Sequence, residues 1–336
     1  DRKIDLMNLN VIGNYINDYK SIYVAYSGGI DSTALLYACF LLKEESKIKK
    51  LTAIHINHNL SKNAKLWESH CYNICNELDI KLIVKSIKIK TSKDGLESAA
   101  RKARYDIFSN LIKKDELLLV AHHADDVAET ILFRLFRGTG IDGLEGPKEK
   151  RSIGEGILIR PLLQFTKKEL LEFIDLHNVN YIEDESNKES NQDRNFIRNE
   201  IMPLINQRWN NFEKRIQSTS DFIKDRQEIF NLLFLEKYGS LVSNNSIPLD
   251  IFKDLNSAEA KELIRFVIHK NNIASPSKKV LNEIMKTFYD SNPSESSIVK
   301  WSRADKEQSG GKVIYNSDFI VIKDIEYSGM ITICKS

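Results

Sequence analysis

Six residues near the N-terminus, Ser-Gly-Gly-Ile-Asp-Ser at 27–32, combine residue types that suit phosphate chemistry. The two glycines permit unusual backbone angles and lack the Cβ atoms that would hold an anion away from the main chain. The N–H groups at the start of a helix and the two serine hydroxyls can then donate hydrogen bonds to a phosphate. Because Asp31 would repel a bound phosphate, the loop implies Mg²⁺ held between Asp31 and phosphate oxygens.

The same six residues allow a plainer interpretation. They match neither the GxxxxGK[ST] loop nor the dinucleotide GxGxxG pattern. An ordinary strand-to-helix turn, with Asp31 capping the helix, is the alternative to a phosphate site. We favour the phosphate site, since a plain turn would not need two glycines and two hydroxyls around one acid.

A second group of reactive side chains lies in AHHADDVAET, residues 121–130, which holds three acids and two histidines. Acids in a first helical turn often only cap the helix, and that interpretation stays open for Asp125. Capping does not account for the whole group. Asp126 and Glu129 stand one turn apart and could hold an amine substrate, with one of the acids accepting its proton.

Basic residues are concentrated between residues 81 and 104, a segment that contains eight lysines and arginines but only two acids. The segment LESAARKARYDIF, from Leu96, puts Glu97, Arg101 and Arg104 on or near one helical face. A solvated face with a Glu97–Arg101 pair is the plain interpretation. The local excess of positive charge favours contacts with nucleic-acid phosphates.

A third set of polar residues lies in DRNFIRNEIMPLI, residues 193–205, where Arg194 and Arg198 are one helical turn apart with Asn195 between them. Like charges at this spacing cost a helix ~0.2–0.5 kcal/mol, so a nearby anion explains them better than a solvated face. Phe196 and Ile197 are expected to pack on the other side of the helix.

Strand-like and helical segments alternate up to about residue 183, and these elements must position the reactive groups. Strand-like segments are found at 21–27, 51–57, 81–89, 116–121 and 157–160, and helical segments at 33–45, 64–78, 96–114 and 124–137. This alternation predicts an α/β fold with a mostly parallel, doubly wound sheet and helices on both faces. Ligands in such folds bind beyond the carboxyl ends of the strands, where the polar motifs fall.

The pattern changes after residue 191 to long helices followed by strands. Helices are expected at 212–238, 257–271 and 277–289, strands at 296–304, and a hairpin at 312–323 that turns at 316–318. The first helix carries the apolar residues Phe222, Ile229, Leu232 and Leu233. We predict a catalytic domain at 1–215 and a smaller, mostly helical α+β domain at 216–336.

Composition limits the remaining classes of protein. The 336 residues are 42% hydrophobic, and 49 basic against 47 acidic residues leave a charge of +2, which excludes a uniformly basic coat but not a local basic face. No apolar run reaches the ~18 residues of a membrane span, and no signal-peptide core is found, so we expect a cytoplasmic protein. The four cysteines have no zinc or disulfide spacing.

Six further motifs, in order and spacing, resemble the tRNA(Ile)-lysidine synthase family within the N-type ATP pyrophosphatases. They are HINHNLSKNA (55–64), LESAARKARY (96–105), AHHADDVAETILFRLFRGTGIDGL (121–144), LIRPLL (158–163), EDESN (183–187) and DRNFIRNEIMPLI (193–205). The glycine loop alone would identify only the superfamily. The resemblance covers residues 21–210, implies a Rossmann-like, adenine nucleotide α-hydrolase-like fold, and is weaker beyond 215.

The resemblance implies an ATP-dependent ligase that acts on the wobble cytidine of the isoleucine tRNA with a CAU anticodon. The C2 oxygen of that cytidine would be adenylated, and the ε-amine of L-lysine would then displace AMP to form lysidine, which changes codon specificity from AUG to AUA. The implied partners are ATP with Mg²⁺, L-lysine and the tRNA. Family members tend to form homodimers, although no exposed apolar stripe demands one here, and the further C-terminal domain of longer members is expected to be absent.

The resemblance also implies roles for individual residues. The candidate catalytic residues are Asp31, Arg104, Asp126, Glu129 and Arg194. ATP would contact Ser27, Gly28, Gly29, Ile30, Asp31, Ser32, Ala53, His55 and His122, with Asp31 also holding the metal. Lysine would be bound by Asp126 and Glu129, and the tRNA by Arg101, Arg104, Arg194, Asn195 and Arg198. The acids and the arginines are thus expected to form two sites of opposite charge close together, one for a cationic amino acid and one for RNA.

Two alternatives remain. A 2-thiocytidine synthase of the same superfamily needs reactive cysteine pairs or an iron–sulfur cluster, whereas Cys71 and Cys75 are predicted on a scaffold helix. A nucleotide-binding or RNA-binding protein without chemistry would keep the glycine loop and the basic segment. Such a protein would have no use for the acids at 125, 126 and 129.

Overall fold

The computed structural model describes residues 7–59, 63–87, 96–183, 193–242, 244–271, 273–302 and 309–325, with the backbone alone for 96–98. The chain divides into two compact units, Asp1–Lys224 and Asp225–Ser336. The division falls inside helix α9 (Phe212–Tyr238), about nine residues after the predicted boundary near 215. The two units are described separately below.

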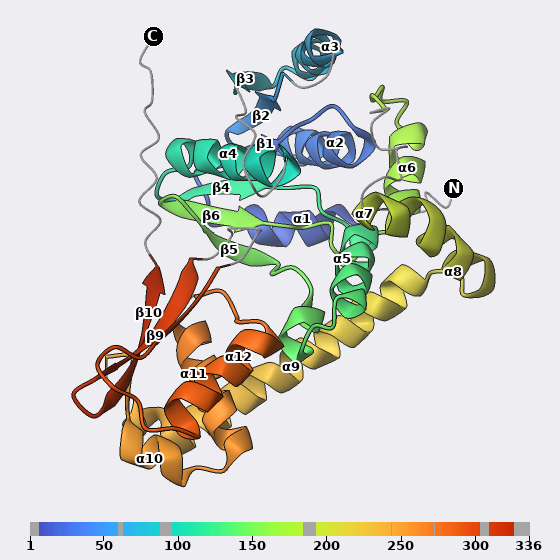
Figure 1. The fold of residues 1–336 in the computed structure, drawn as a ribbon. Helices are drawn as coiled ribbons and strands as arrows, with labels where there is room; N and C mark the ends of the chain where they lie inside the picture. The colour runs from blue at the N-terminus through green and yellow to red at the C-terminus, as the bar shows by residue number, and fades with distance from the viewer. Residues whose placement is uncertain are drawn as a thin grey trace. The chain divides into compact units, whose positions relative to one another are not determined.

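The first unit is built on a six-stranded sheet (Figure 1). Its strands are β1 (Ser21–Ala25), β2 (Leu51–Asn57), β3 (Lys81–Ser86), β4 (Glu116–Leu119), β5 (Lys150–Ile153) and β6 (Gly156–Ile159), in the order β3-β2-β1-β4-β6-β5. All neighbours pair in parallel except β5, which is antiparallel to β6. The predicted mostly parallel α/β sheet is therefore confirmed, and β1 lies at its centre.

Helices cover both faces of this sheet. The helices of the first unit that precede α9 are α1 (Leu9–Ile16), α2 (Ile30–Glu44), α3 (Ala64–Glu77), α4 (Leu96–Leu111), α5 (Ala124–Phe136), α6 (Lys167–Leu176), α7 (Asp193–Phe196) and α8 (Met202–Arg208). Residues of α1, α2, α3 and α6 share one apolar core with alternate strand positions such as Val24 and Ala53. The intervening positions, such as Ile54 and Leu118, pack with Phe108 of α4 in a second core. Successive side chains of a strand point to opposite faces, so a strand with helices on both faces contributes residues to both cores.

The edge strand β5 and the helices α1 and α6 are absent from the sequence prediction. The segment Lys150–Ile153 has no alternating apolar pattern, because Ile153 is its single buried residue. Its hairpin turns at Gly154, whose φ is +56°. A Cβ atom there would lie 2.1 Å from the carbonyl oxygen of Ser109 at the end of α4, so only glycine fits. The hairpin carries its basic residues to the carboxyl end of β6.

One prediction about side-chain packing is wrong. Ile197 is buried as expected, but Phe196 is 48% exposed, because consecutive residues of a helix point in different directions. On α9 the apolar residues named from the sequence are exposed: Phe222, Ile229, Leu232 and Leu233. The buried apolar positions of that helix are Phe212, Phe234 and Tyr238.

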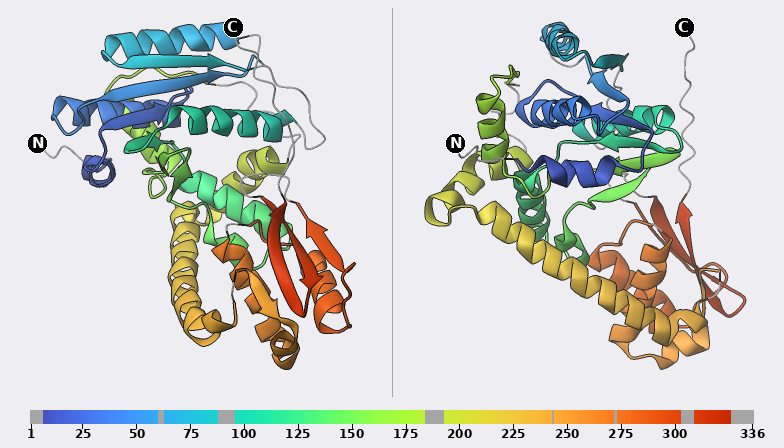
Figure 2. Two further views of the ribbon diagram at one scale, coloured as in Figure 1. Left: turned by 90° about the vertical axis from the view of Figure 1, so that its left-hand side faces the viewer. Right: turned by 180° about the vertical axis from the view of Figure 1, so that it is seen from behind.

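The second unit packs helices on a small antiparallel sheet (Figure 2). Its elements are β7 (Ser246–Pro248), α10 (Leu249–Asp254), α11 (Ser257–Lys270), α12 (Lys278–Ile284) with a π-helical continuation at Met285–Tyr289, β8 (Ile298–Trp301), β9 (Gly310–Asn316) and β10 (Phe319–Ile325). The strand order is β7-β10-β9-β8. The predicted hairpin turn is confirmed, with Ser317 and Asp318 both at positive φ. Short 3-10 turns occur at Ile141–Glu145 and Gly239–Leu241.

None of the described helices combines the length and the apolar character needed to cross a membrane.

Candidate functional site

The glycine loop joins the end of β1 to the start of α2, at the centre of the sheet's carboxyl edge. Gly28 has a φ of +86°, and Gly29 is the N-cap of α2. The Ser32 hydroxyl donates to the carbonyl of Gly29 at 3.0 Å, accepts from the Ser27 N–H at 3.2 Å, and lies 3.0 Å from the Ser27 hydroxyl. The two serines therefore brace the loop from within, and the N–H groups of the first helical turn remain directed at the edge.

Replacing Gly28 with alanine is expected to lower ATP affinity at least tenfold and the free energy of unfolding by about 1–2 kcal/mol. The new Cβ atom would lie 3.1 Å from the Cys71 sulfur, in a backbone conformation that alanine rarely adopts. Calorimetric titration with ATP and urea denaturation measure the two effects. Gly138→Ala is the control, because Gly138 has a φ of +70° but nothing within 4 Å of its Cβ position. Unchanged ATP affinity in Gly28→Ala would contradict the role of the loop.

Three aspartates surround one histidine beside this loop, and we call the four residues the acid–histidine cluster. His123 Nε2 lies 3.5 Å from Asp31 Oδ1 and 3.6 Å from Asp126 Oδ2, and His123 Nδ1 lies 3.3 Å from Asp125 Oδ2. His123 is the N-cap of α5 and is 4% exposed. Asp126 accepts the backbone N–H of His123 at 3.1 Å, and Asp125 accepts the backbone N–H of Lys167 at 2.8 Å. Helix α5 is thereby fixed to the loop.

The charged groups of this cluster shift one another's pKa values. Burial by itself would lower the pKa of His123, but Asp126, Asp125 and Asp31 raise it well above its ordinary value. Burial likewise acts to raise the pKa of Asp31 and Asp125, and contact with His123 leaves both below the ordinary value. The three carboxylates therefore favour the imidazolium form of His123. The sequence-based assignment named His122 and left out His123, although the adjacent acids were a signal for it.

His123→Gln is expected to reduce the free energy of unfolding at pH 7 by about 2–3 kcal/mol, because it removes the cation that three partly buried carboxylates share. The loss should shrink in acid: the pKa values of Asp31 and Asp125 are depressed below 3.8, so their stabilisation is present above that pH and disappears as pH falls through the folded-state values. The raised pKa of His123 has the opposite sign, with its contribution complete below 6.5 and lost as pH rises through the folded value. Urea denaturation from pH 3 to 9 tests this; a loss independent of pH would contradict the ion pairing.

Glu129 lies one turn further along α5 and meets two arginines. Arg198 Nη2 is 2.6 Å from Glu129 Oε2 and 3.7 Å from Asp126 Oδ1, and Arg194 Nε is 3.8 Å from Glu129 Oε1. Glu129 is 3% exposed, and burial raises its pKa above the ordinary value, with Asp126 adding to the effect and the arginines opposing it. The acids and the arginines assigned to different tasks are therefore paired at Arg194 and Arg198, because the anion that they meet is Glu129 itself. Asn195 lies between them in α7.

The two histidines assigned to this edge from the sequence, His122 and His55, both have lowered pKa values. Arg160, directly after β6, donates its Nε–H to His122 Nδ1 at 2.7 Å, and burial together with Arg160 holds the pKa of His122 well below its ordinary value. His55 Nδ1 lies 3.0 Å from the Tyr26 carbonyl and 3.4 Å from the Cys71 sulfur, and burial lowers its pKa. Ala53, in contrast, is fully buried inside β2 and belongs to the core rather than to the edge.

Arginines from two elements surround Tyr105 at the same edge. The guanidinium carbons of Arg101 and Arg104 lie 5.2 and 5.7 Å from the Tyr105 ring centroid, and that of Arg151 lies 4.3 Å from it. We call these four residues the Tyr105 cluster. The arginines on α4 were assigned from the sequence, whereas Tyr105 and Arg151 were not. The basic residues Lys88, Lys90 and Lys93, the acid Asp94 and the side chain of Glu97 lie outside the described part of the chain.

The burial of the cysteine thiols is relevant to the alternative of a sulfur-transferring enzyme, which needs reactive cysteines. Burial raises the pKa of Cys71 and of Cys75 to about 12, and Cys39 is fully buried. Thiols of this kind are poor nucleophiles. Cys71 nevertheless lies nearer the loop than the predicted scaffold position suggests, because it packs beside Gly28. Cys334 lies outside the described residues.

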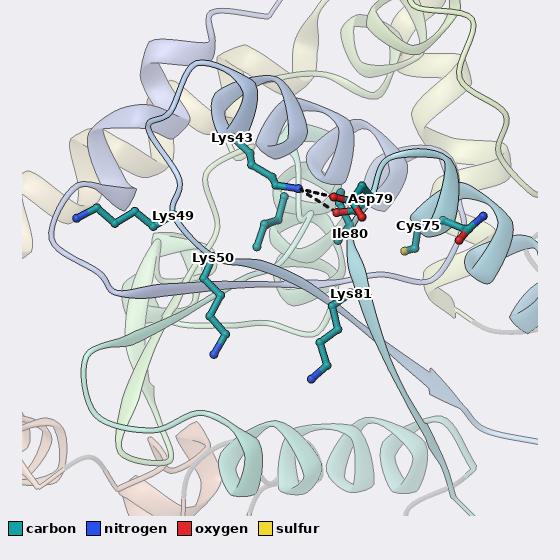
Figure 3. A pocket seen from close by; sticks show the side chains of 9 residues that line it. Lys43, Lys49, Lys50, Cys75, Asp79, Ile80 and Lys81 are labelled. Atoms are coloured by element: carbon teal, nitrogen blue, oxygen red, sulfur yellow. Dashed lines mark hydrogen bonds and ion pairs between the residues drawn. The ribbon is translucent and has the colours of Figure 1, made fainter.

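A cavity of about 400 Å³ lies at the opposite edge of the sheet, at the amino ends of β2 and β3 (Figure 3). It is lined by Lys43, Lys49, Lys50, Leu51, Cys75, Asn76, Asp79, Ile80 and Lys81. Lys43 donates to the Asp79 carbonyl at 2.9 Å. The cavity opens where α2 and α3 end, and lysines near helix C-termini are stabilised by the carbonyls there. The position away from the strands' carboxyl ends makes it a poor candidate for the reaction site.

Comparison with known families agrees with the geometry of the loop. The model of the PP-loop domain family matches residues 4–205, which include the glycine loop, the acid–histidine cluster and both arginines of α7 and its continuation. This chain belongs to the PP-loop domain family. Residues 27–32 are therefore called the PP-loop below.

The PP-loop chain is similar to curated bacterial proteins over most of its length. It is 40% identical to the tRNA(Ile)-lysidine synthase of Buchnera aphidicola subsp. Schizaphis graminum over 84% of this chain and 65% of that protein. It is 33% identical to the tRNA(Ile)-lysidine synthase of Legionella pneumophila strain Paris over 86% of this chain and 66% of that protein. The chain thus spans just under two thirds of the length of these relatives.

A solved structure shows the same fold at low sequence identity. The U34-tRNA thiolase NcsA from Methanococcus maripaludis superposes with a TM-score of 0.51 at 16% identity, over 64% of this chain and 78% of that one. The likeness supports the arrangement of strands and helices and extends no further than the fold.

Proposed function

We propose that this chain is a tRNA(Ile)-lysidine synthase, which joins L-lysine to C2 of the wobble cytidine of the CAU-anticodon isoleucine tRNA at the expense of ATP. One observation carries the proposal: Asp126 and Glu129 stand at the same sheet edge as the PP-loop and are tied to it through His123 and Arg198. A nucleotide site and a site for a cationic amino acid are thereby adjacent. The names of the curated relatives support the same activity.

In the proposed first half-reaction the C2 oxygen of cytidine attacks the α-phosphorus of ATP. A new P–O bond forms, the bond to the β-phosphate oxygen breaks, and pyrophosphate leaves with the negative charge. The PP-loop amides hold the phosphates and stabilise that charge. His55 is proposed for the adenosine pocket, and His122, whose pKa burial and Arg160 hold well below its ordinary value, for a hydrogen bond to the nucleotide.

Mg²⁺ fits the residues at the PP-loop. Asp31 Oδ1 is buried and has no hydrogen-bond partner among the described residues. No group of three or more His, Cys, Asp or Glu side chains in the described ranges is arranged to hold a metal alone, so phosphate oxygens would complete the ligand set with Asp31. When bound there, the ion would neutralise charge that develops on the phosphates.

In the proposed second half-reaction the neutral ε-amine of lysine attacks C2 of the adenylated base. A C–N bond forms, the C–O bond to AMP breaks, and a carboxylate accepts the proton that the amine releases. Asp126 and Glu129 hold the lysine side chain, and burial suits Glu129 to the task of base because it raises the pKa. The guanidinium groups of Arg194 and Arg198 keep the Glu129 carboxylate in place.

The tRNA contacts are proposed for Arg101, Arg104, Arg194, Asn195 and Arg198. The wobble base must leave the stack of the anticodon loop to reach the PP-loop, which costs little in a single-stranded loop. A cytoplasmic setting follows from the tRNA substrate.

Incubation with ATP, labelled lysine and tRNA tests the proposal. Isoleucine and methionine tRNAs that both carry CAU should be compared, since the proposed enzyme must separate them. We expect label on the isoleucine tRNA, with AMP and pyrophosphate released in equal amounts. Absence of both label and AMP would leave only a binding protein, and AMP without lysine on RNA would indicate a different acceptor.

A further inference from the structure

The Tyr105 cluster contains one arginine, Arg151, in addition to the two that were assigned from the sequence. Arg101, Arg104 and Arg151 approach one aromatic ring from two elements that are far apart in the sequence, α4 and the edge strand β5. Each lies within the ~6 Å range of a cation–π contact. Three like charges that converge on one ring repel one another, and an anion that approaches the ring is attracted by all three.

The arginines around Tyr105 lower the pKa of its hydroxyl group. Burial acts to raise the pKa of Tyr105, yet Arg101, Arg160, Arg104 and Arg151 outweigh it and leave the pKa below the ordinary value. Arg160 is also the donor to His122, so the cluster is continuous with the carboxyl edge of the sheet. The field at Tyr105 is that of a site for a negative ligand.

Arg151 supplies an independent observation. Its Nε–H is buried and has no hydrogen-bond acceptor in the part of the chain that the structure describes. A buried donor without a partner costs about 1–3 kcal/mol, so such groups are rare unless a ligand completes them. The guanidinium carbon of Arg151 lies 4.3 Å from the centroid of the Tyr105 ring. This stacking fixes the plane of the guanidinium and of its N–H groups.

We propose that Arg151 and Tyr105, together with Arg101 and Arg104, form a cradle for an RNA phosphodiester next to the reacting nucleotide. This inference rests on the proposed function, and it adds an element, the β5–β6 hairpin, to the tRNA-binding surface. Tyr105 acts as the platform that holds the guanidiniums, and Arg151 donates its free N–H to a phosphate oxygen. Charge-assisted contacts of this kind position a nucleic acid without reading its sequence.

An RNA phosphate suits the cradle better than the phosphates of ATP. The PP-loop already provides backbone amides for the nucleotide at the end of β1, whereas the cradle is built on α4 and β5. Exposed Lys85 on β3 and Lys102 on α4 add further positive charge on neighbouring elements. A polyanion with successive charges can contact several of these groups, while a mononucleotide cannot.

Arg151→Gln tests the cradle against a matched control. We expect the Kd for an anticodon stem-loop RNA with CAU to rise about tenfold, and the slope of log K against log salt to fall in magnitude by about 1. Lys150→Gln removes the same charge from the preceding, exposed residue of β5 and should change the Kd less than twofold. Tyr105→Leu should weaken binding like Arg151→Gln, while Tyr105→Phe, which keeps the ring, should not. Equal urea midpoints confirm that the variants are folded.

Three results would overturn the inference: equal weakening by Arg151→Gln and Lys150→Gln, a normal RNA Kd in Arg151→Gln, or an increase in KM for ATP without a change in RNA binding. The last would assign the cradle to nucleotide phosphate. Lysine transfer by the wild-type chain separates the two proposals. Transfer with unaltered RNA binding by Arg151→Gln rejects the cradle alone, whereas weakened RNA binding without any lysine transfer supports the cradle and rejects the synthase.

Discussion

Asp31→Asn is expected to lower the rate of pyrophosphate release from ATP and tRNA about 10²–10³-fold while the chain stays folded. Asp31 is the second residue of α2 and part of the PP-loop, and its buried Oδ1 lies 3.5 Å from His123 Nε2 without a hydrogen-bond partner among the described residues. Asparagine keeps the shape but removes the charge that a divalent cation requires. Pyrophosphate release without added lysine measures this step by itself.

Asp125→Asn provides the comparison, because it removes the same charge from the same acid–histidine cluster. Asp125 contacts His123 at 3.3 Å, but its other partner is the Lys167 backbone N–H, away from the PP-loop. We expect a loss of pyrophosphate release below tenfold for this variant, and a larger loss of stability than for Asp31→Asn. Equal effects on pyrophosphate release would mean that Asp31 acts only by pairing with His123.

The sheet could be predicted from the sequence because its strands carry their own signals. Leu51–Asn57 is found with the predicted bounds, and Ser21–Ala25 is shorter than predicted only at its end. Both are β-branched, apolar and followed by polar loops, so local pattern and burial agree. Edge strand β5 carries no such signal, because its position depends on the Gly154 turn and on contact with α4.

Pairings across the site could not be predicted in the same way. Glu129 and Arg198 are 69 positions apart, and nothing in the local sequence of either says that they meet. The spacing of Arg194 and Arg198 did indicate a nearby anion, but not that the anion belongs to α5. His123 was overlooked for a related reason: its charge is set by carboxylates from two separate segments, which only the folded chain brings together.

Glu129→Gln is expected to reduce transfer of labelled lysine to tRNA about 10²–10³-fold and pyrophosphate release less than fivefold. The carboxylate of Glu129 is 3% exposed and is held by Arg198 at 2.6 Å, so it has one orientation toward the edge. Glutamine preserves the size of the side chain and one acceptor for Arg198, but it cannot take a proton from the lysine amine. Parallel assays of pyrophosphate and of labelled tRNA separate the two half-reactions.

Glu200→Gln is the matched control for this experiment. Glu200 lies in the same π-helical turn as Arg198 but is exposed, so its replacement changes the net charge equally without touching the network. Both half-reactions should stay within twofold of the wild type in that variant. If Glu129→Gln slowed both steps to the same extent, Glu129 would be a support for Arg198 and the PP-loop, and the lysine proton would have to go to Asp126, the other carboxylate within reach of the Arg198 guanidinium.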